Sequence, residues 1–325
     1  MYLYITIGVF IIVIVILLVR VYQKCTNGVC TSEARLDGKT ALVTGGTAGM
    51  GLEIAKDLAR RGARVIIACP FEQEGHTAEA EIKSETQNDN VQYKHLDLAS
   101  LKSVRKLASD ILETENRLDI LVNNAGVLTP GDFMTEDGIN FIMQVNYFGH
   151  FLLTLLLVPL LKKSAPSRIV NTSSILHRGG IFRLDKINTT GFYYPSHVYC
   201  ISKFCVVPFS TELTKRLVGT GVVANSVDPG AVGTHIFDTV KPKFVGDIIR
   251  VFFSYFYKTA KEGAQTAIHV AVDEDAGKVS GAFFKNCKQT YAMTSAYDDK
   301  LAKELWDLSA TLVGLSPEDV DKCFV

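Results

Sequence analysis

Tyr199 and Lys203 stand four residues apart in the segment Tyr199-Cys200-Ile201-Ser202-Lys203. On an α-helix this spacing stacks a phenol beside an ammonium group on one face. A phenol ordinarily loses its proton near pH ~10, and a neighbouring positive charge favours the phenolate and lowers that pKa. The pair therefore has the chemistry of a general acid/base. The same spacing is common on solvated helix faces, so the elements around it must decide between the two interpretations.

A glycine-rich turn follows the first expected strand, residues 39–44, and leads into a helical pattern over residues 52–61. Its glycines let the backbone turn tightly and approach a pyrophosphate, while the helix N-terminus offers free amides to the phosphates. The spacing is G-x-x-x-G-x-G, not the common G-x-G-x-x-G, and a turn without a ligand is the alternative. The residues expected to contact a dinucleotide here are Gly45, Thr47, Gly49, Met50 and Gly51.

Three further apolar strands are expected at residues 118–122, 168–172 and 222–227. Ligands of open α/β sheets bind beyond the carboxyl ends of such strands. The sequence therefore predicts an α/β fold, a doubly wound parallel sheet in a single Rossmann-like domain. The cofactor contacts expected beyond these strands are Asn124, Ala125, Gly126, Pro229, Gly230 and Thr234.

In this order the motifs resemble the short-chain dehydrogenase/reductase family, in its retinol-dehydrogenase-like branch, over about residues 38–315. The resemblance implies an NAD(P)-dependent oxidoreductase acting on CH–OH groups. Segments at residues 65–68, 95–100, 224–230 and 258–264 look most like the polyprenol dehydrogenase and dolichal reductase members. Isoprenoids of that type are therefore the first expected substrate, followed by retinol or retinal, then by sterols or fatty aldehydes. This order rests on analogy, because a fold does not determine a substrate.

The resemblance also implies roles for individual residues. Tyr199 would exchange a proton with the substrate oxygen, and Lys203 would hold the nicotinamide ribose and depress the pKa of Tyr199. Ser174 would hydrogen-bond the reacting oxygen, with Ser173 left as the alternative, and Asn146 would position a water in a proton relay. A non-catalytic, dinucleotide-binding membrane adaptor is the competing hypothesis, and a complete catalytic set argues against it.

Cofactor choice is the point at which the chain departs from its broader relatives. NAD-specific enzymes place an acid after the second strand, for the ribose 2′-hydroxyl, and NADP users place an Arg nearby for the 2′-phosphate. Here the second expected strand, residues 64–69, ends in Cys69-Pro70-Phe71. We therefore expect weak discrimination and use of NADP and NAD. Asp97 is expected to accept from the adenine amino group, with helix capping before the next helix as the alternative.

Composition agrees with one globular enzyme. Lys plus Arg and Asp plus Glu both number 34, so the net charge is zero and no nucleic-acid partner is expected. The seven cysteines lack paired metal spacing, which predicts free thiols and no metal site. We expect a transmembrane signal anchor at residues 1–20 and a juxtamembrane linker at residues 21–37. The catalytic domain is expected at residues 38–315, followed by a C-terminal tail at residues 316–325.

Residues 1–19 contain no charged side chain and are long enough to cross a bilayer. Basic residues follow them, at Arg20, Lys24 and Arg35, which is the reverse of a cleaved signal peptide and keeps that flank cytosolic. We expect an uncleaved anchor in the endoplasmic reticulum membrane, with a mitochondrial membrane as the alternative. The aromatic segment 244–257 is expected either in the headgroup region or packed inward, as core or as a homodimer face.

Overall fold

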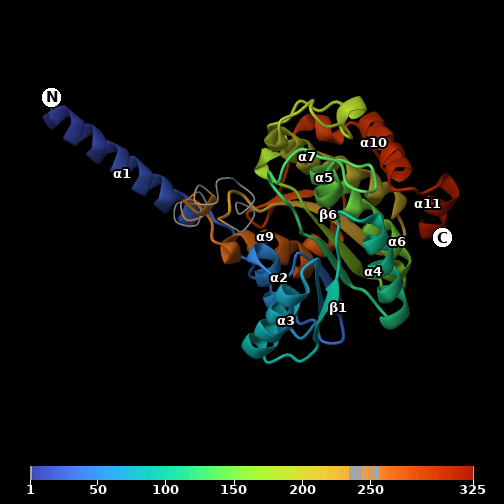
Figure 1. Cartoon of the computed structure of the whole chain (residues 1–325). Helices are drawn as coiled ribbons and strands as arrows, with labels where there is room; N and C mark the ends of the chain where they lie inside the picture. The colour runs from blue at the N-terminus through green and yellow to red at the C-terminus, as the bar shows by residue number, and fades with distance from the viewer. Residues whose placement is uncertain (1, 234–243, 245, 249–250, 252–256, 325) are drawn as a thin grey trace.

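The computed structural model describes residues 2–233, 244, 246–248, 251 and 257–324 (Figure 1). Within them eight strands form one sheet, in the order β3-β2-β1-β4-β5-β6-β7-β8. All neighbouring strands are parallel except β7 and β8, which form an antiparallel hairpin. The strands are β1 Thr40–Thr44, β2 Arg64–Cys69, β3 Val91–His95, β4 Ile120–Asn123, β5 Ser167–Thr172, β6 Val222–Asp228, β7 Phe283–Lys285 and β8 Lys288–Thr290.

Helices cover both faces of the sheet, which confirms the predicted doubly wound fold. Alternate residues of β1 enter different cores: Leu42 packs on one side, and Ala41 and Val43 pack on the other. The strand is therefore buried on both faces and reads as a continuous apolar run. One face carries α2 Gly49–Arg60, α3 Glu72–Thr86 and α9 Ala260–Val272, and the other carries α4 Leu101–Thr114, α6 Gly149–Lys163, α7 Pro195–Arg216 and α10 Asp299–Leu312.

Short helical segments complete the catalytic domain. A three-residue helix, α5 (Phe141–Met143), runs through a π-helical turn, Gln144–Phe148, directly into α6. The 3₁₀ segments are Ile175–Arg178, Leu184–Lys186, Ala276–Lys278 and Thr294–Tyr297.

The N-terminal helix α1 (Tyr2–Thr26) projects away from the catalytic domain, as Figure 1 shows. It continues past the expected anchor boundary, through Arg20 and Lys24. Within the residues that the structure describes, two helices are long and apolar enough to cross a membrane, but residues 141–163 are mostly buried in the core. Of these two, only α1 leaves its apolar side chains exposed.

The segment expected to be a C-terminal tail contains a packed helix, α11 (Pro317–Phe324). Val320 and Cys323 are buried, and the ring of Phe324 lies 6.1 Å from that of Trp306 on α10. An eight-residue helix is too short to be stable alone in water, so these apolar contacts stabilise it.

Candidate active site

A cavity of about 680 Å³ lies at the carboxyl ends of the central strands. Its size is within the range of small-molecule and cofactor sites, and it lies where the strand order reverses, between β1 and β4. Most of the sequence-predicted site residues line it: Gly45, Thr47, Gly49, Met50, Asp97, Asn124, Ala125, Gly126, Ser174, Tyr199, Lys203, Pro229 and Gly230. Of the other predicted residues, Gly51 and Asn146 lie behind this lining, and Thr234 and most of the segment 244–257 lie outside the described residues.

The glycine turn closes so tightly that only hydrogen fits at two positions. Gly45 has a φ of +63°, and a Cβ there would lie 3.0 Å from the Cα of Ala125, just past the end of β4. A Cβ on Gly51 would lie 2.0 Å from the carbonyl oxygen of Gly45. Gly51 therefore lets α2 start against the turn, and the first two residues of α2, Gly49 and Met50, line the cavity.

Tyr199 and Lys203 both lie on α7, and their side chains are 6 % and 3 % exposed. The Lys203 ammonium lies 5.9 Å from the centre of the Tyr199 ring and donates to the Thr172 carbonyl oxygen at 3.0 Å. Both Tyr199 and Ser174 line the cavity, and the Ser174 side chain acts on the phenol by lowering its pKa. The hydroxyl of Ser173 instead donates to the Lys203 carbonyl oxygen at 2.8 Å. The geometry therefore favours Ser174 over Ser173 as the partner of the phenol.

Burial dominates the proton affinities of this pair. It raises the pKa of Tyr199 to about 12, and the hydrogen bond from Ser174 lowers that pKa only in part. Burial also lowers the pKa of Lys203 to about 8. The predicted depression of the Tyr199 pKa is therefore not seen in the protein alone. The physical reason is that removal from water favours the neutral form of both groups.

Asn146 lies in the π-helical turn, and its side-chain amide is engaged by the protein. Its Oδ1 accepts from the Val127 amide at 2.8 Å, and its Nδ2 donates to the Val127 carbonyl at 2.9 Å and to the Ser202 hydroxyl at 3.0 Å. A Cβ on Gly126 would lie 3.3 Å from Asn146 Oδ1 and 3.4 Å from Lys203 Nζ. Gly126 thus leaves room beside its backbone for both the amide oxygen and the ammonium.

His150, which sequence reasoning missed, connects this turn to β1. Its Nδ1 lies 3.3 Å from the Asn146 carbonyl oxygen, and its Nε2 lies 2.9 Å from the Thr44 hydroxyl. That hydroxyl also accepts from the backbone amides of Asn124 and Ala125, at 2.9 and 3.1 Å. Burial, reinforced by the Lys203 ammonium, lowers the pKa of His150 to about 3. The neutral ring therefore donates from Nδ1 to Asn146 and accepts at Nε2 from Thr44.

A second, polar cavity of about 10 Å³ lies beside these residues. Asn123 Oδ1 and Thr172 Oγ1 are buried there without a hydrogen-bond partner, and Asn146 and His150 share the lining. A cavity of this size and polarity fits one water molecule. The polar network around Asn146 can therefore extend inward from the large cavity.

The end of the cavity beside β2 carries a carboxylate that the sequence analysis did not anticipate. Cys69 closes β2, and its thiol, whose pKa is raised by burial, donates to the Phe71 carbonyl oxygen at 3.2 Å. Glu74, on the first turn of α3, lines the cavity and interacts electrostatically with that thiol. Among the described lining residues Lys203 is the only Lys or Arg. Glu74 lies on α3 and not at the end of β2, so the residues at the strand end alone did not predict that it lines the cavity.

Asp97 lines the cavity while its Oδ1 accepts from the Ala99 amide at 2.9 Å. Ser100 itself caps α4, accepting from the Ser103 amide at 3.2 Å. Asp97 is thus held by the turn that begins α4.

No group of three or more His, Cys, Asp or Glu residues in the described part of the chain is arranged to hold a metal ion.

Comparison with known proteins gives the following relatives. The profile of the short chain dehydrogenase family matches residues 39–243. Retinol dehydrogenase 12 of Bos taurus is 42 % identical over 289 residues, covering 89 % of this chain and 90 % of the relative. Retinol dehydrogenase 13 of Homo sapiens is 42 % identical over 299 residues, with 91 % and 90 % covered. A crystal structure of an uncharacterised protein from Mycobacterium paratuberculosis superposes with a TM-score of 0.71 at 27 % identity, covering 89 % and 98 %.

Proposed function

The chain belongs to the short-chain dehydrogenase family and is an NAD(P)-dependent oxidoreductase acting on CH–OH groups, and from this premise we propose that it interconverts a retinoid-type alcohol and its aldehyde. The similar proteins are named retinol dehydrogenases, so retinoids move ahead of the polyprenol and dolichal isoprenoids that the sequence analysis placed first. The observation that carries the proposal is that Ser174, Tyr199 and Lys203 line one cavity together with apolar side chains.

The substrate side of the cavity supports a lipophilic molecule. Leu128, Phe141, Val145, Ile175 and Leu176 line it together. Such walls favour a long hydrocarbon substrate, because each buried apolar group gains free energy on leaving water. A polar substrate would find few hydrogen-bond partners apart from the catalytic side chains.

In the proposed reaction Ser174 and Tyr199 hold the substrate oxygen between two hydroxyl groups. The bound dinucleotide supplies or accepts the hydride. The neutral Tyr199 phenol, with a pKa of about 12, is protonated at neutral pH and donates its proton to the oxygen of an aldehyde during reduction. The Thr172 carbonyl oxygen accepts from the Lys203 ammonium and holds it beside the phenol, while Asn146 and His150 hold the π-helical turn.

We assign the cofactor site to the glycine turn, the start of α2 and residues 124–126, with Lys203 for the ribose. The chain lacks an Arg after β2, which agrees with the proposed use of both NAD and NADP.

α1 is proposed to anchor the enzyme in the endoplasmic reticulum membrane with the catalytic domain in the cytosol, and a mitochondrial membrane stays the alternative. Because the chain is an enzyme by family, the adaptor hypothesis is set aside.

A substrate panel tests the proposal. Full-length protein in detergent is given all-trans-retinal, an isoprenoid aldehyde and a short-chain aldehyde, each with NADH and with NADPH. We expect the highest kcat/KM with retinal and a loss of about 10²- to 10⁴-fold in kcat for Tyr199→Phe. Faster turnover of the isoprenoid aldehyde would place isoprenoids ahead of retinoids as substrates. Unchanged turnover in Tyr199→Phe would refute the role of Tyr199 as proton donor.

A further inference from the structure

We propose that the segment joining α1 to the catalytic domain is docked on that domain and holds the start of α9 against the headgroup surface of a lipid bilayer. The inference rests on the membrane attachment given under the proposed function. It changes the expected role of residues 21–37, which the sequence analysis treated as a linker. The docked segment, residues 24–30, is called the clasp below.

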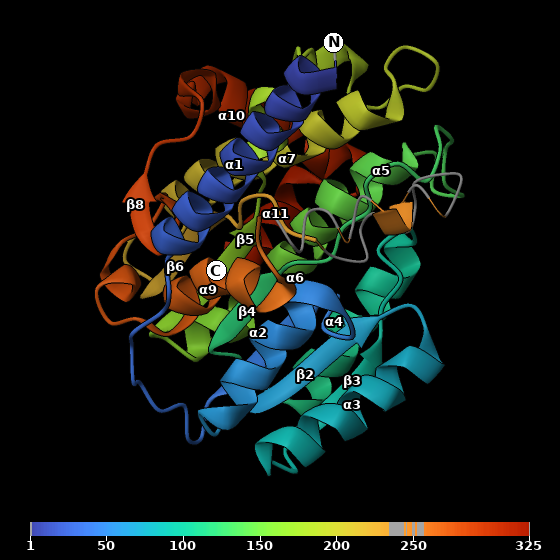
Figure 2. The same cartoon turned by 90° about the vertical axis from the view of Figure 1, so that its left-hand side faces the viewer.

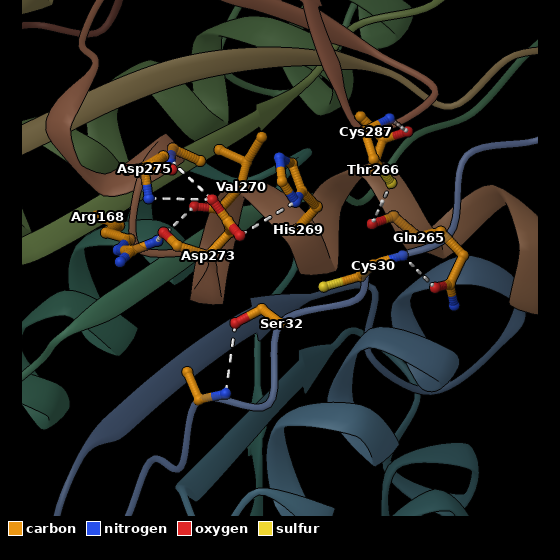
Figure 3. Close-up of polar contacts among 12 residues, drawn as sticks. Cys30, Ser32, Arg168, Gln265, Thr266, His269, Val270, Asp273, Asp275 and Cys287 are labelled. Carbon is orange, nitrogen blue, oxygen red and sulfur yellow. Dashed lines mark hydrogen bonds and ion pairs between the residues drawn. The ribbon is translucent and has the colours of Figure 1, made fainter.

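The clasp meets α9 and the β7–β8 hairpin at three points. The Lys24 ammonium donates to Glu262 Oε1 at 2.6 Å, in the first turn of α9. A Cβ on Gly28 would lie 2.1 Å from the carbonyl oxygen of Asn286, at the hairpin tip. The Cys30 amide donates to Gln265 Oε1 at 3.1 Å, as Figure 3 shows. A free tether would show no such close backbone approach at Gly28.

The hairpin tip and α9 form one surface under the clasp. Asn286 and Cys287 form the turn between β7 and β8, and both have a positive φ, of +50° and +57°. The Cys287 thiol donates to the Gln265 carbonyl at 3.4 Å, and its amide donates to the Thr266 hydroxyl at 3.3 Å (Figure 3). The hairpin is therefore tied to the same turn of α9 that binds Cys30.

This surface reaches the wall of the active-site cavity through Lys258. The Lys258 ammonium donates to Asn286 Oδ1 at 2.7 Å, and the side chain is buried. Its backbone pairs with the chain that leaves β6: the Lys258 amide donates to the Ala231 carbonyl at 3.1 Å, and the Gly233 amide donates to the Lys258 carbonyl at 3.0 Å. Ala231 lines the cavity. Lys258 therefore links the cavity wall to the residue on which Gly28 rests.

The bilayer is the occupant that the chain itself indicates for this face. α1 exposes apolar side chains and ends at Thr26, so Lys24 stands in its last turn, at the level where a lysine reaches the headgroups. Glu262, its partner, must then lie at the same level. Figure 2 shows α1 and α9 on the same side of the molecule. Val29 in the clasp is an exposed apolar residue, and so are Phe244, Ile248 and Val251, which precede Lys258 by 7 to 14 residues.

The test uses full-length protein in phosphatidylcholine nanodiscs that carry one protein copy and a photo-crosslinking headgroup lipid. Gly28→Val places a side chain where none fits, and Gly8→Val makes the same change on α1, where a Cβ meets nothing within 4 Å. We expect slow amide exchange at residues 28–31 and 258–266, headgroup cross-links in both segments, and at least about tenfold faster exchange there in Gly28→Val only.

Cross-links confined to α1, together with fast exchange at residues 28–31 in the unaltered protein, would overturn the proposal and make the segment a free tether. Protection that appears only when two copies share a disc would assign the face to a second chain and overturn it as well. Neither measurement uses turnover, so a protein that fails on retinal can still support the clasp, and an active one can still refute it.

Discussion

At the scale of single residues, Glu74 places a carboxylate in the cavity lining beside the end of β2, where relatives select between NAD and NADP. It lines the cavity beside Cys69, and no Arg or Lys of the described lining opposes it there. A phosphate carries up to two negative charges, so Glu74 should bias an otherwise weak selection toward NAD. The side chain is exposed, and solvent therefore screens the repulsion.

We predict that Glu74→Gln raises kcat/KM for NADPH relative to NADH by up to about tenfold, and less at high salt. Steady-state kinetics with both cofactors measures the ratio. Glu72→Gln is the matched control, because Glu72 lies on the same helix turn, is highly exposed and is absent from the cavity lining. An equal change in both variants would mean that general surface charge sets the ratio.

Lys203 makes the reaction depend on pH. Its pKa is lowered by burial to about 8, so its positive charge is present below that pH and lost above it. Because kcat/KM for the cofactor reports groups of the free enzyme, it should fall as the pH rises through about 8. Lys203→Arg should remove the fall in this range, since a guanidinium keeps its proton, although its geometry lowers the absolute rate. A profile that stays flat to pH 10 in the unaltered enzyme would contradict the assigned role.

At the scale of elements, the π-helical turn before α6 is the feature that positions Asn146. The extra residue in this turn rotates Asn146 toward Val127 and Ser202 and directs its carbonyl to His150. π-turns of this kind are rare and occur frequently at functional sites. A regular α-helix through these residues would lack this offset.

The C-terminal helix α11 also acts as an element of the core. Ending the chain after Ser316 removes the buried Val320 and Cys323 and uncovers Trp306. We predict a loss of about 2–5 kcal/mol in the free energy of unfolding, because burial of two side chains and an aromatic contact is lost. Urea unfolding of the detergent-solubilised protein measures this, with Asp321→Asn on the exposed side of α11 as the control. Equal stability of the shortened chain would mean that α11 packs only loosely.

At the scale of the whole molecule, membrane attachment and catalysis occupy separable parts. The candidate span in α1 has no buried residues, and neither hydrophobic core includes it. We predict that a chain beginning at Asn27 keeps the thermal stability and dinucleotide affinity of the catalytic domain and no longer floats with liposomes. Thermal unfolding and liposome flotation measure the two properties. Loss of dinucleotide binding in the shortened chain would show that α1 supports the fold of the cleft.

Much of this molecule follows from local pattern. The run of residues 64–69 is a strand because it is short, apolar and bounded by turn residues, and the structure has β2 at the same bounds. The Tyr199 and Lys203 pair shares one helix, so its juxtaposition depends on helical geometry alone. The carboxyl ends of parallel strands lie at one sheet edge, and this brings residues 45, 124, 174 and 229 to one cavity.

The sequence by itself therefore determined the strands, the glycine turn, the Tyr199 and Lys203 pair and the apolar N-terminal helix, because each depends on spacing within a few residues. Only the tertiary structure decided which serine faces the phenol, that His150 joins Thr44 to Asn146, that Glu74 lines the cavity, and that Gly28 rests on the hairpin tip. Those contacts join segments far apart in the chain. Burial likewise reversed the expected shift in the Tyr199 pKa, because the degree of exclusion from water is a property of the packed molecule.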